Sequence, residues 1–173
     1  MSCVIGLVQD GHIYLGADGY ATTEEGERRP IIARKLVRNK DYIFGYTGSV
    51  RTGQLIGPHD FDPPDNIDDL SEALRQHLYE RGCVATNEIN LQMQACNFLV
   101  VYGERLYEIL MDFQLNEVMG NYTAVGSGAP YAMGALYVLD RTKLQAVDKI
   151  EMALKAASEY HTTCGPPFDY EYV

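Results

Sequence analysis

The sequence predicts an α+β fold, a four-layer αββα sandwich of two antiparallel sheets with helices outside. Strand-like runs come in pairs around short turns, as on either side of Asp10-Gly11, and such pairs are typical of antiparallel hairpins. Helical patterns occur in separate blocks rather than after every strand, which favours an α+β over an α/β topology. Runs such as 4–8 are apolar at nearly every position, so both faces of these strands should be covered.

The expected elements follow from these patterns in chain order. Turn residues separate the strand-like runs, and hairpins or strands are expected at 4–15, 33–46, 97–111, 121–125 and 168–173. Helices are expected over 49–57, 69–82, 131–139 and 146–157, and apolar residues repeat at helical spacing in the second and the last of these. In the second of these helices, Asp69 and Glu72 form a capping-box pattern and Gly82 marks the end. The polar segment 23–30 is expected to be an exposed loop.

Length and composition limit the classes of protein. The 173 residues suit one domain, 1–173, with a sizeable core. The net charge of −10 and the lack of a Lys/Arg block disfavour nucleic-acid binding. No apolar run reaches the roughly 20 residues of a membrane helix and no secretory signal is visible, so we expect a cytoplasmic protein without a membrane partner. The four cysteines lack the spacing of metal ligands, and we expect neither a metal nor another cofactor.

The N-terminal segment brings reactive groups together. A strand-like run begins at Val4, and a strand at the start of a chain holds the terminus in place. Removal of Met1 before the small Ser2 would leave a hydroxyl and a free α-amine on one residue. A serine hydroxyl needs an adjacent base, and an α-amine with a pKa of about 7.7–8.0 suits that role. Ser2 could also be an ordinary first serine. Strand alternation turns the Cys3 side chain to the opposite face from Ser2, into the core.

Five segments in order carry a resemblance to a known family. They are Ser2-Cys3-Val4-Ile5-Gly6, Gly16-Ala17-Asp18-Gly19, Lys35, Gly45-Tyr46-Thr47-Gly48 and Gly126-Ser127-Gly128. Their order and spacing resemble the proteasome β-subunits, and most closely the HslV-type bacterial peptidases, within the N-terminal-nucleophile hydrolases. The resemblance extends from Met1 to about Tyr160, nearly the whole chain. It implies the same αββα sandwich that the strand and helix patterns predict.

The resemblance implies a set of catalytic residues. Ser2 would attack a peptide carbonyl and form an acyl-enzyme, with its own α-amine as the base. Lys35 would favour the neutral amine and the developing oxyanion, and Asp18 would pair with Lys35. The Gly45 N–H would donate to the oxyanion, and Ser127 would relay the proton of the amine. Taken singly, the four supporting residues allow plainer roles: a strand end, an exposed lysine, a packing glycine and a helix cap.

The same resemblance implies further residues around the site. The first substrate pocket would be lined by Ala21, Ala33, Ile43 and Thr47. Their small or apolar side chains predict an apolar residue before the cleaved bond. In the loop 160–166, His161 and Cys164 would stand where the family often carries Asp and Ser. His161 is expected to be either a core histidine with its hydrogen bonds satisfied or a modulator of the pKa of the amine.

Partners are implied by the resemblance alone. Family members form hexameric or heptameric rings stacked in pairs, usually fed by a ring-shaped ATPase. We therefore expect self-association and peptide substrates, with an AAA+ unfoldase ATPase as a candidate partner. Two other functions remain open from the sequence: a non-catalytic ring or scaffold subunit of the same fold, and an amidase of the same class that acts on a small amide.

Overall fold

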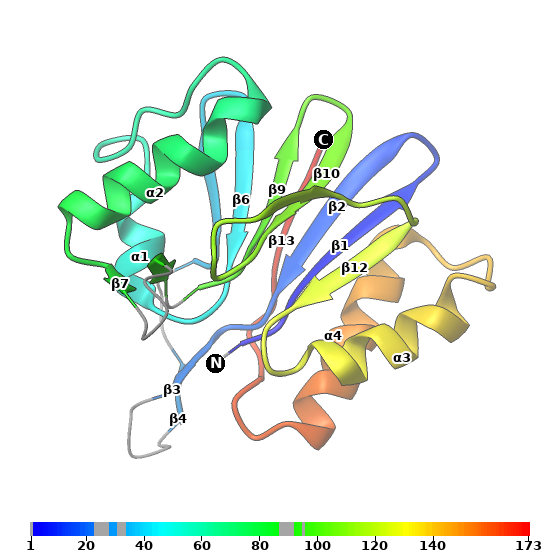
Figure 1. Ribbon diagram of the computed structural model, residues 1–173. Coiled ribbons are helices and arrows are strands. Elements are labelled where there is room, and N and C mark those ends of the chain that lie inside the picture. The colour runs from blue at the N-terminus through cyan, green and yellow to red at the C-terminus, as the bar shows by residue number, and fades with distance from the viewer. Residues whose placement is uncertain (1, 23–27, 31–33, 87–91, 95) are drawn as a thin grey trace.

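The computed structural model describes residues 2–22, 28–30, 34–86, 92–94 and 96–173. The chain forms the predicted four-layer αββα sandwich, with two stacked sheets between two pairs of helices (Figure 1). The first sheet has the strand order β12-β1-β2-β13, and its strands are β1 (Val4–Gln9), β2 (His12–Ala17), β12 (Tyr122–Val125) and β13 (Asp169–Tyr172). The second has the order β11-β10-β9-β6-β5, and its strands are β5 (Leu36–Asn39), β6 (Tyr42–Tyr46), β9 (Phe98–Tyr102), β10 (Arg105–Ile109) and β11 (Leu115–Glu117).

Hairpins build both sheets, as the sequence predicts, and their neighbouring strands are antiparallel. The first hairpin turns at Asp10 and Gly11, whose φ angles of 53° and 80° match a two-residue turn that follows the twist of the strands. The predicted C-terminal edge strand is β13, which pairs with β2. Backbone bonds in both directions between Ile13 and Val173 continue this pairing to the last residue.

Two pairs of helices cover the outer faces of the sheets. The five-stranded sheet is covered by α1 (Val50–Leu55) and α2 (Leu70–Glu80), and the four-stranded sheet by α3 (Ala129–Leu139) and α4 (Ala146–Tyr160) (Figure 1). All four helices lie where the sequence predicts them, to within a few residues at their ends. None of the described helices is long and apolar enough to cross a membrane.

The apolar core has three parts because each sheet has two covered faces. Leu74 lies in the cluster between α2 and the five-stranded sheet, and Cys3 and Ile5 lie in the cluster under α3 and α4. Val4 lies in the third cluster, between the two sheets. Consecutive residues at the start of β1 therefore face different cores, as strand geometry requires. The prediction that strands are covered on both faces is confirmed.

The start of α2 differs from the capping box that the sequence predicts. The Asp69 side chain makes no capping hydrogen bond. Instead, a short 3₁₀ turn, Ile67–Asp69, precedes the helix, and the Asn66 side chain accepts a hydrogen bond from the N–H of Asp68. The cap has therefore moved one turn earlier in the chain. Gly82 ends the segment as predicted, with a φ of 69° that favours glycine.

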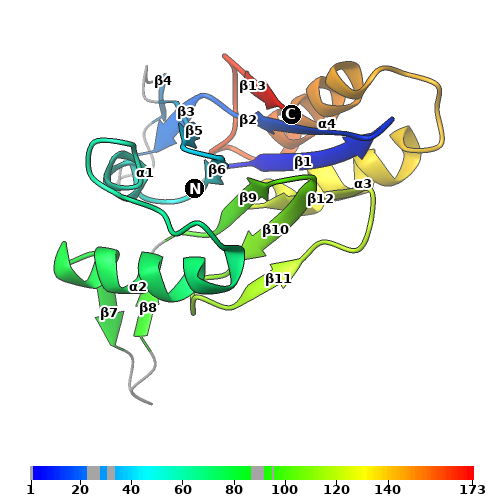
Figure 2. The same cartoon turned by 90° about the horizontal axis from the view of Figure 1, so that it is seen from above.

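Two small ribbons and the strand β11 were not predicted. β3 (Tyr20–Thr22) pairs with β4 (Arg28–Pro30), and β7 (Val84–Thr86) pairs with β8 (Gln92–Gln94). β4 lies in the segment that was expected to be an exposed loop, so that expectation is wrong for residues 28–30. Figure 2 shows the β7–β8 ribbon projecting away from the sandwich. Three-residue strands, like β11, carry too few side chains to show a periodic pattern.

Leu74 offers a test of the core between α2 and its sheet. The side chain is fully buried, so Leu74→Ala should lower the free energy of unfolding by about 2–5 kcal/mol, through lost apolar burial and the cavity left behind. Urea denaturation measures this change. Tyr79→Ala is the matched control, since Tyr79 is exposed on the same helix and its loss should change stability by about 0.5 kcal/mol or less. Equal effects of the two changes would contradict the assigned packing.

Candidate active site

Three of the predicted catalytic residues lie at one end of the sandwich, where strands of the first sheet begin or end. Ser2 precedes β1, Asp18 follows β2, and Ser127 follows β12. The strand register holds these ends together, because the first residue of β1 pairs with the last residue of β2 and with the last residue of β12. The N-terminus marked in Figure 1 lies at this end of the sheets.

Lys35 reaches the same place from the second sheet. It directly precedes β5, and its carbonyl accepts a hydrogen bond of 3.0 Å from the N–H of Tyr46. Its Nζ lies 2.6 Å from Oδ1 of Asp18 and 2.7 Å from the carbonyl oxygen of Tyr20. The Lys35 and Asp18 side chains are 3% and 0% exposed. The plainer alternative, an exposed lysine on a sheet edge, is therefore wrong.

Asp18 is also held by the backbone around it. Its Oδ1 accepts from the N–H of Cys3 at 2.8 Å, and its Oδ2 accepts from the N–H groups of Tyr20 at 3.1 Å and Gly165 at 3.4 Å. These donors compensate for the water that the buried carboxylate has lost. Because one oxygen binds both the Lys35 ammonium and the N–H of Cys3, the ion pair lies one residue away from Ser2.

One of the three N–H groups of the Lys35 ammonium has no acceptor among the described residues. Burial lowers the pKa of Lys35 below its ordinary value, and the Asp18 carboxylate opposes that shift. An ammonium carries three N–H donors, of which one binds Asp18 and one binds Tyr20. Among the described residues the third donor has no partner.

The Ser2 position is tightly enclosed. Ser2 is 2% exposed, and strand alternation turns it toward the second sheet, like Val4. Its carbonyl oxygen accepts a hydrogen bond of 3.2 Å from the N–H of Gly128. Gly126 has a φ of 98°, and a Cβ at this position would lie 2.2 Å from the same carbonyl oxygen. Only glycine fits there, which explains the first glycine of the Gly-Ser-Gly motif.

A chain of two hydroxyls and an imidazole ends at Ser2. The Ser127 Oγ lies 3.4 Å from the carbonyl oxygen of Ser2 and 3.0 Å from the Oγ1 of Thr163. The same Thr163 oxygen lies 2.8 Å from Nδ1 of His161. Ser127 does not cap α3, since Gly128 is the N-cap residue and no side chain caps that helix. Sequence reasoning missed Thr163, because it lies far from Ser127 in the chain and no local pattern marks it.

Cys3 and Cys164 belong to the core rather than to the reactive groups. Both are fully buried, and both lie against Gly128, where a Cβ would approach the Cys164 Sγ to 2.6 Å. Burial raises the pKa of the Cys3 thiol, and it raises the pKa of Cys164 to about 11. Neither thiol is primed to ionise at neutral pH. Thr163, and not Cys164, makes the contact with Ser127.

Gly45 does not fit the expected role of oxyanion donor. It lies within β6, which pairs with β5 on one side and with β9 on the other. The N–H of Tyr46 points toward β5, so alternation directs the N–H of Gly45 toward β9, inside the sheet. A Cβ on Gly45 would lie 2.6 Å from a methyl group of Val4, so the glycine permits close packing of the two sheets. The plainer alternative, a packing glycine, accounts for this residue.

Gly48 is better placed than Gly45 to donate to a bound group. It follows Thr47, whose methyl group lies 2.9 Å from the Cβ position of Gly126, beside the carbonyl of Ser2. Gly48 is half-buried and has a φ of 90°, which favours glycine. No described residue accepts a hydrogen bond from its N–H.

The expected substrate pocket is matched only in part. Ile43 is 2% exposed and lies in the core between the sheets, so its assignment to a substrate pocket is wrong. Ala33 lies outside the described residues. Ala21 is half-buried in β3, and Thr47 lies near Ser2, as noted above. A pocket of about 260 Å³ next to Lys35 is lined by Arg34, Val37, Tyr46, Gly53, Gln54 and Gly57.

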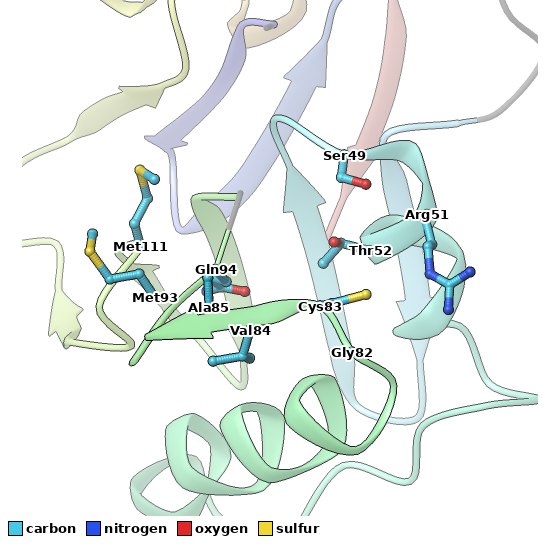
Figure 3. Close-up of a pocket in the computed structure, with 10 residues that line it drawn as sticks. All are labelled: Ser49, Arg51, Thr52, Gly82, Cys83, Val84, Ala85, Met93, Gln94 and Met111. Atoms are coloured by element: carbon cyan, nitrogen blue, oxygen red, sulfur yellow. The ribbon is translucent and has the colours of Figure 1, made fainter. Parts of the chain in front are cut away.

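A larger pocket lies apart from these residues. It has a volume of about 540 Å³ and lies between the N-terminal end of α1 and the β7–β8 ribbon (Figure 3). Thr52 lines it on the α1 side, and Met93 and Met111 line the opposite side. None of the predicted catalytic residues contributes to it. In the described part of the chain, no group of three or more His, Cys, Asp or Glu residues could hold a metal ion.

Comparison with solved structures identifies the fold. BPH from Thiobacillus denitrificans, solved in complex with epoxomicin, is 22% identical and superposes with a TM-score of 0.86, covering 99% of this chain and 97% of that one. Eukaryotic HslV from Trypanosoma brucei is 20% identical, with a TM-score of 0.71 and 98% of each chain covered. A mutant of Anbu from Hyphomicrobium sp. strain MC1 is 13% identical, with a TM-score of 0.69, covering 98% of this chain and 81% of that one.

These matches confirm the fold that the sequence resemblance implies. The chain has the HslV- and proteasome-type fold, that of the N-terminal-nucleophile hydrolases. No protein-family model and no curated protein matches the sequence. At identities of 23% and below, the structural likeness establishes the fold, and the activity has to be argued from the site.

Lys35→Met tests the buried ion pair. The change leaves the Asp18 carboxylate buried without its cation, so the free energy of unfolding should fall by about 3–5 kcal/mol. Chemical denaturation monitored by circular dichroism measures it. Lys40→Met is the matched control, because Lys40 pairs with Asp62 at the surface. The unfolding midpoint of the Lys40→Met protein should equal that of the wild type. A Lys35→Met protein as stable as the wild type would contradict the geometry.

Proposed function

We propose that this chain is a serine-type N-terminal-nucleophile peptidase subunit. It cleaves peptide bonds through an acyl-enzyme on Ser2, after removal of Met1 has exposed the α-amine. The observation that carries the proposal is the buried Lys35–Asp18 ion pair. It holds an ammonium whose third N–H has no partner among the described residues, and it lies one residue away from an enclosed serine that precedes β1.

The first half of the reaction forms the ester bond. The Ser2 Oγ attacks the carbonyl carbon of the substrate while the neutral α-amine of the same residue takes the hydroxyl proton. The Lys35 ammonium favours this step because a second cation beside it is disfavoured, which keeps the α-amine neutral. The third N–H of the Lys35 ammonium donates to the Ser2 Oγ. The tetrahedral intermediate collapses when the protonated α-amine returns its proton to the leaving amine.

The oxyanion of that intermediate needs donors that are already in place. We assign this role to the N–H of Gly48, in place of Gly45. Its N–H has no acceptor among the described residues, and it lies next to Thr47 beside the Ser2 carbonyl. A single donor of this kind is worth about 3 kcal/mol of transition-state stabilisation.

The second half of the reaction releases the product. A water molecule attacks the ester carbonyl, and the neutral α-amine takes a proton from that water. The Ser2 oxygen leaves with the proton that the α-amine returns, so the free enzyme and a carboxylic acid are restored. Asp18 takes no proton in this scheme. Its role is to hold Lys35 charged and in position between the two sheets.

We propose that an apolar side chain stands before the cleaved bond. Ala21 and Thr47 remain as candidate contacts, joined by the pocket next to Lys35. Arg34 at the border of that pocket is largely exposed and lies 3.9 Å from Asp169, so its charge is partly balanced.

Assembly into stacked rings is part of the proposal. The outer helices expose apolar side chains, including Tyr137 and Val138 on α3 and Met152 and Tyr160 on α4. Exposed apolar side chains gathered on adjacent elements are typical of a surface that is covered by a partner. A second copy of this chain is the partner that we assign to this face. A ring-shaped AAA+ ATPase that supplies unfolded chains would complete the system.

Ser2→Ala tests the nucleophile. The variant should lose turnover of short fluorogenic peptides to background, about a 10⁴-fold fall in kcat or more, because the attacking oxygen is absent. Ser2→Thr should retain activity, since it keeps a hydroxyl on the same atom. Ser158→Ala, half-buried on α4, is the matched control and should behave like the wild type.

The same samples separate the peptidase from the alternatives. Intact mass should show a chain that begins at Ser2. Epoxomicin, the compound bound to the Thiobacillus protein, should add one molecule per active chain, and Ser2→Ala should block the addition. Turnover that survives Ser2→Ala would exclude the mechanism. A wild type without any turnover would favour a scaffold subunit, and a preference for small amides over peptides would favour an amidase.

Analytical ultracentrifugation tests the assembly. The wild type should sediment as a particle of many subunits. Val138→Asp should reduce the particle size, because it places a charge on the exposed apolar face of α3. Arg105→Ala on β10 is the control, since Arg105 is largely exposed, lies on the other sheet from α3 and α4, and pairs with Glu117. A wild type that sediments as a stable monomer would overturn the ring proposal.

A further inference from the structure

His161 and Thr163 form a hydrogen-bonded turn that the proposed mechanism does not yet use. Nδ1 of His161 lies 3.3 Å from the backbone nitrogen of Thr163 and 2.8 Å from its Oγ1. The backbone of His161 is extended, with φ −121° and ψ 118°. The arrangement is that of an Asx turn, in which a side-chain acceptor binds the N–H two residues later, with Nδ1 in the position of an Asn oxygen.

The protonation of the imidazole follows from these two contacts. A backbone N–H can only donate a hydrogen bond, so the Nδ1 of His161 that faces it must be an acceptor. The ring is then neutral, with its proton on Nε2. The centroid of the Tyr131 ring lies 6.1 Å from that of the imidazole, and the two rings are tilted by 56°.

An acceptor at Nδ1 sets the direction of the whole hydroxyl chain. Each hydroxyl has one proton to donate. The Thr163 O–H donates to His161, so the Thr163 oxygen accepts from the Ser127 O–H at 3.0 Å. The Ser127 proton cannot also serve the Ser2 carbonyl, whose distance of 3.4 Å is long for an O–H···O bond. Ser127 therefore presents lone pairs, and not its proton, to Ser2.

We propose that His161 is a positioning residue, which acts through Thr163 to hold Ser127 as a hydrogen-bond acceptor for the α-amine of Ser2. This inference rests on the proposed function, since it assigns the amine as the base. An acceptor beside the amine stabilises the protonated form that exists after each proton transfer. It also orients the lone pair of the neutral amine toward the Ser2 hydroxyl. Without the acceptor at position 161, the hydroxyl chain can reverse and Ser127 can donate to Ser2 instead.

Two variants of His161 separate an acceptor from a packing side chain. His161→Phe keeps a ring of similar shape beside Tyr131 but removes the acceptor, and it should lower kcat about 10- to 100-fold with KM little changed. His161→Asn keeps an acceptor that can bind the N–H of Thr163 in an Asx turn, and it should keep kcat within about 3-fold of the wild type. A purely structural role would make Asn the worse substitute, because it fills less space.

A double-mutant cycle tests whether the effect passes through Thr163. Thr163→Val removes the hydroxyl and keeps the backbone N–H, and it should lower kcat about as much as His161→Phe does. The double variant should be no worse than either single variant, because all three break the same chain. Fully additive losses, or a His161→Phe enzyme with the kcat of the wild type, would overturn the proposal.

Two spectroscopic measurements need no turnover. In solid-state NMR of protein labelled with ¹⁵N-histidine, the resonances lost in His161→Asn should belong to a ring protonated on Nε2 and not on Nδ1. The ¹⁵N resonance of the Ser2 α-amine should titrate at lower pH in His161→Phe than in the wild type. A proton on Nδ1, or identical titrations, would overturn the inference. Loss of Ser2-dependent turnover alone, with both spectra as expected, would overturn the proposed function instead.

Discussion

The arrangement at the end of the sandwich depends on one buried ion pair. Lys35 comes from the second sheet and Asp18 from the first, so their contact of 2.6 Å joins the two sheets. A buried lysine without a counter-ion would be strongly disfavoured, and so would a buried carboxylate without donors. Asp18 satisfies both needs because it also accepts from backbone N–H groups of three separate segments. The start of β1, the turn after β2 and the loop before β13 are thereby fixed around one carboxylate.

The alternation of side chains along β1 determines what surrounds Ser2. Val4 packs between the sheets and Cys3 packs under the helices, which leaves Ser2 on the side of Lys35. Glycine at position 126 then lets the chain pass directly against the Ser2 carbonyl. The hydroxyl is held by the packing of two cores, and not by a flexible loop. This rigidity suits the role that we propose for Ser2, in which the hydroxyl meets its base and its substrate in one geometry.

Sequence patterns were sufficient to predict the residues whose positions depend only on the pairing of strands. Ser2, Asp18 and Ser127 meet because hairpin register is fixed by short turns, and the periodic helices are where their apolar spacing places them. Gly45 and Ile43 were assigned wrongly for other reasons. The N–H of Gly45 is directed into the pairing of β6 with β9, which the local sequence of β6 does not reveal. Whether Ile43 faces a substrate or a neighbouring sheet depends on which sheet stacks against its strand, and that is decided by tertiary packing. Thr163 was missed likewise, because its partners are brought together only by the packing of the loop after α4 against α3.

The antiparallel pairing of β13 with β2 sends the two ends of the chain in opposite directions. Val173 lies beside Ile13, whereas Ser2 lies beyond the other end of β2, roughly 20 Å away along the strand (Figure 1). Arg38 of β5 binds both Glu171 and the carbonyl of Tyr172, so the last strand is anchored to each sheet. A purification tag or fluorophore fused after Val173 would therefore leave the α-amine of Ser2 free. The same fusion before Ser2 would convert that α-amine into an amide and so remove the base of the proposed mechanism.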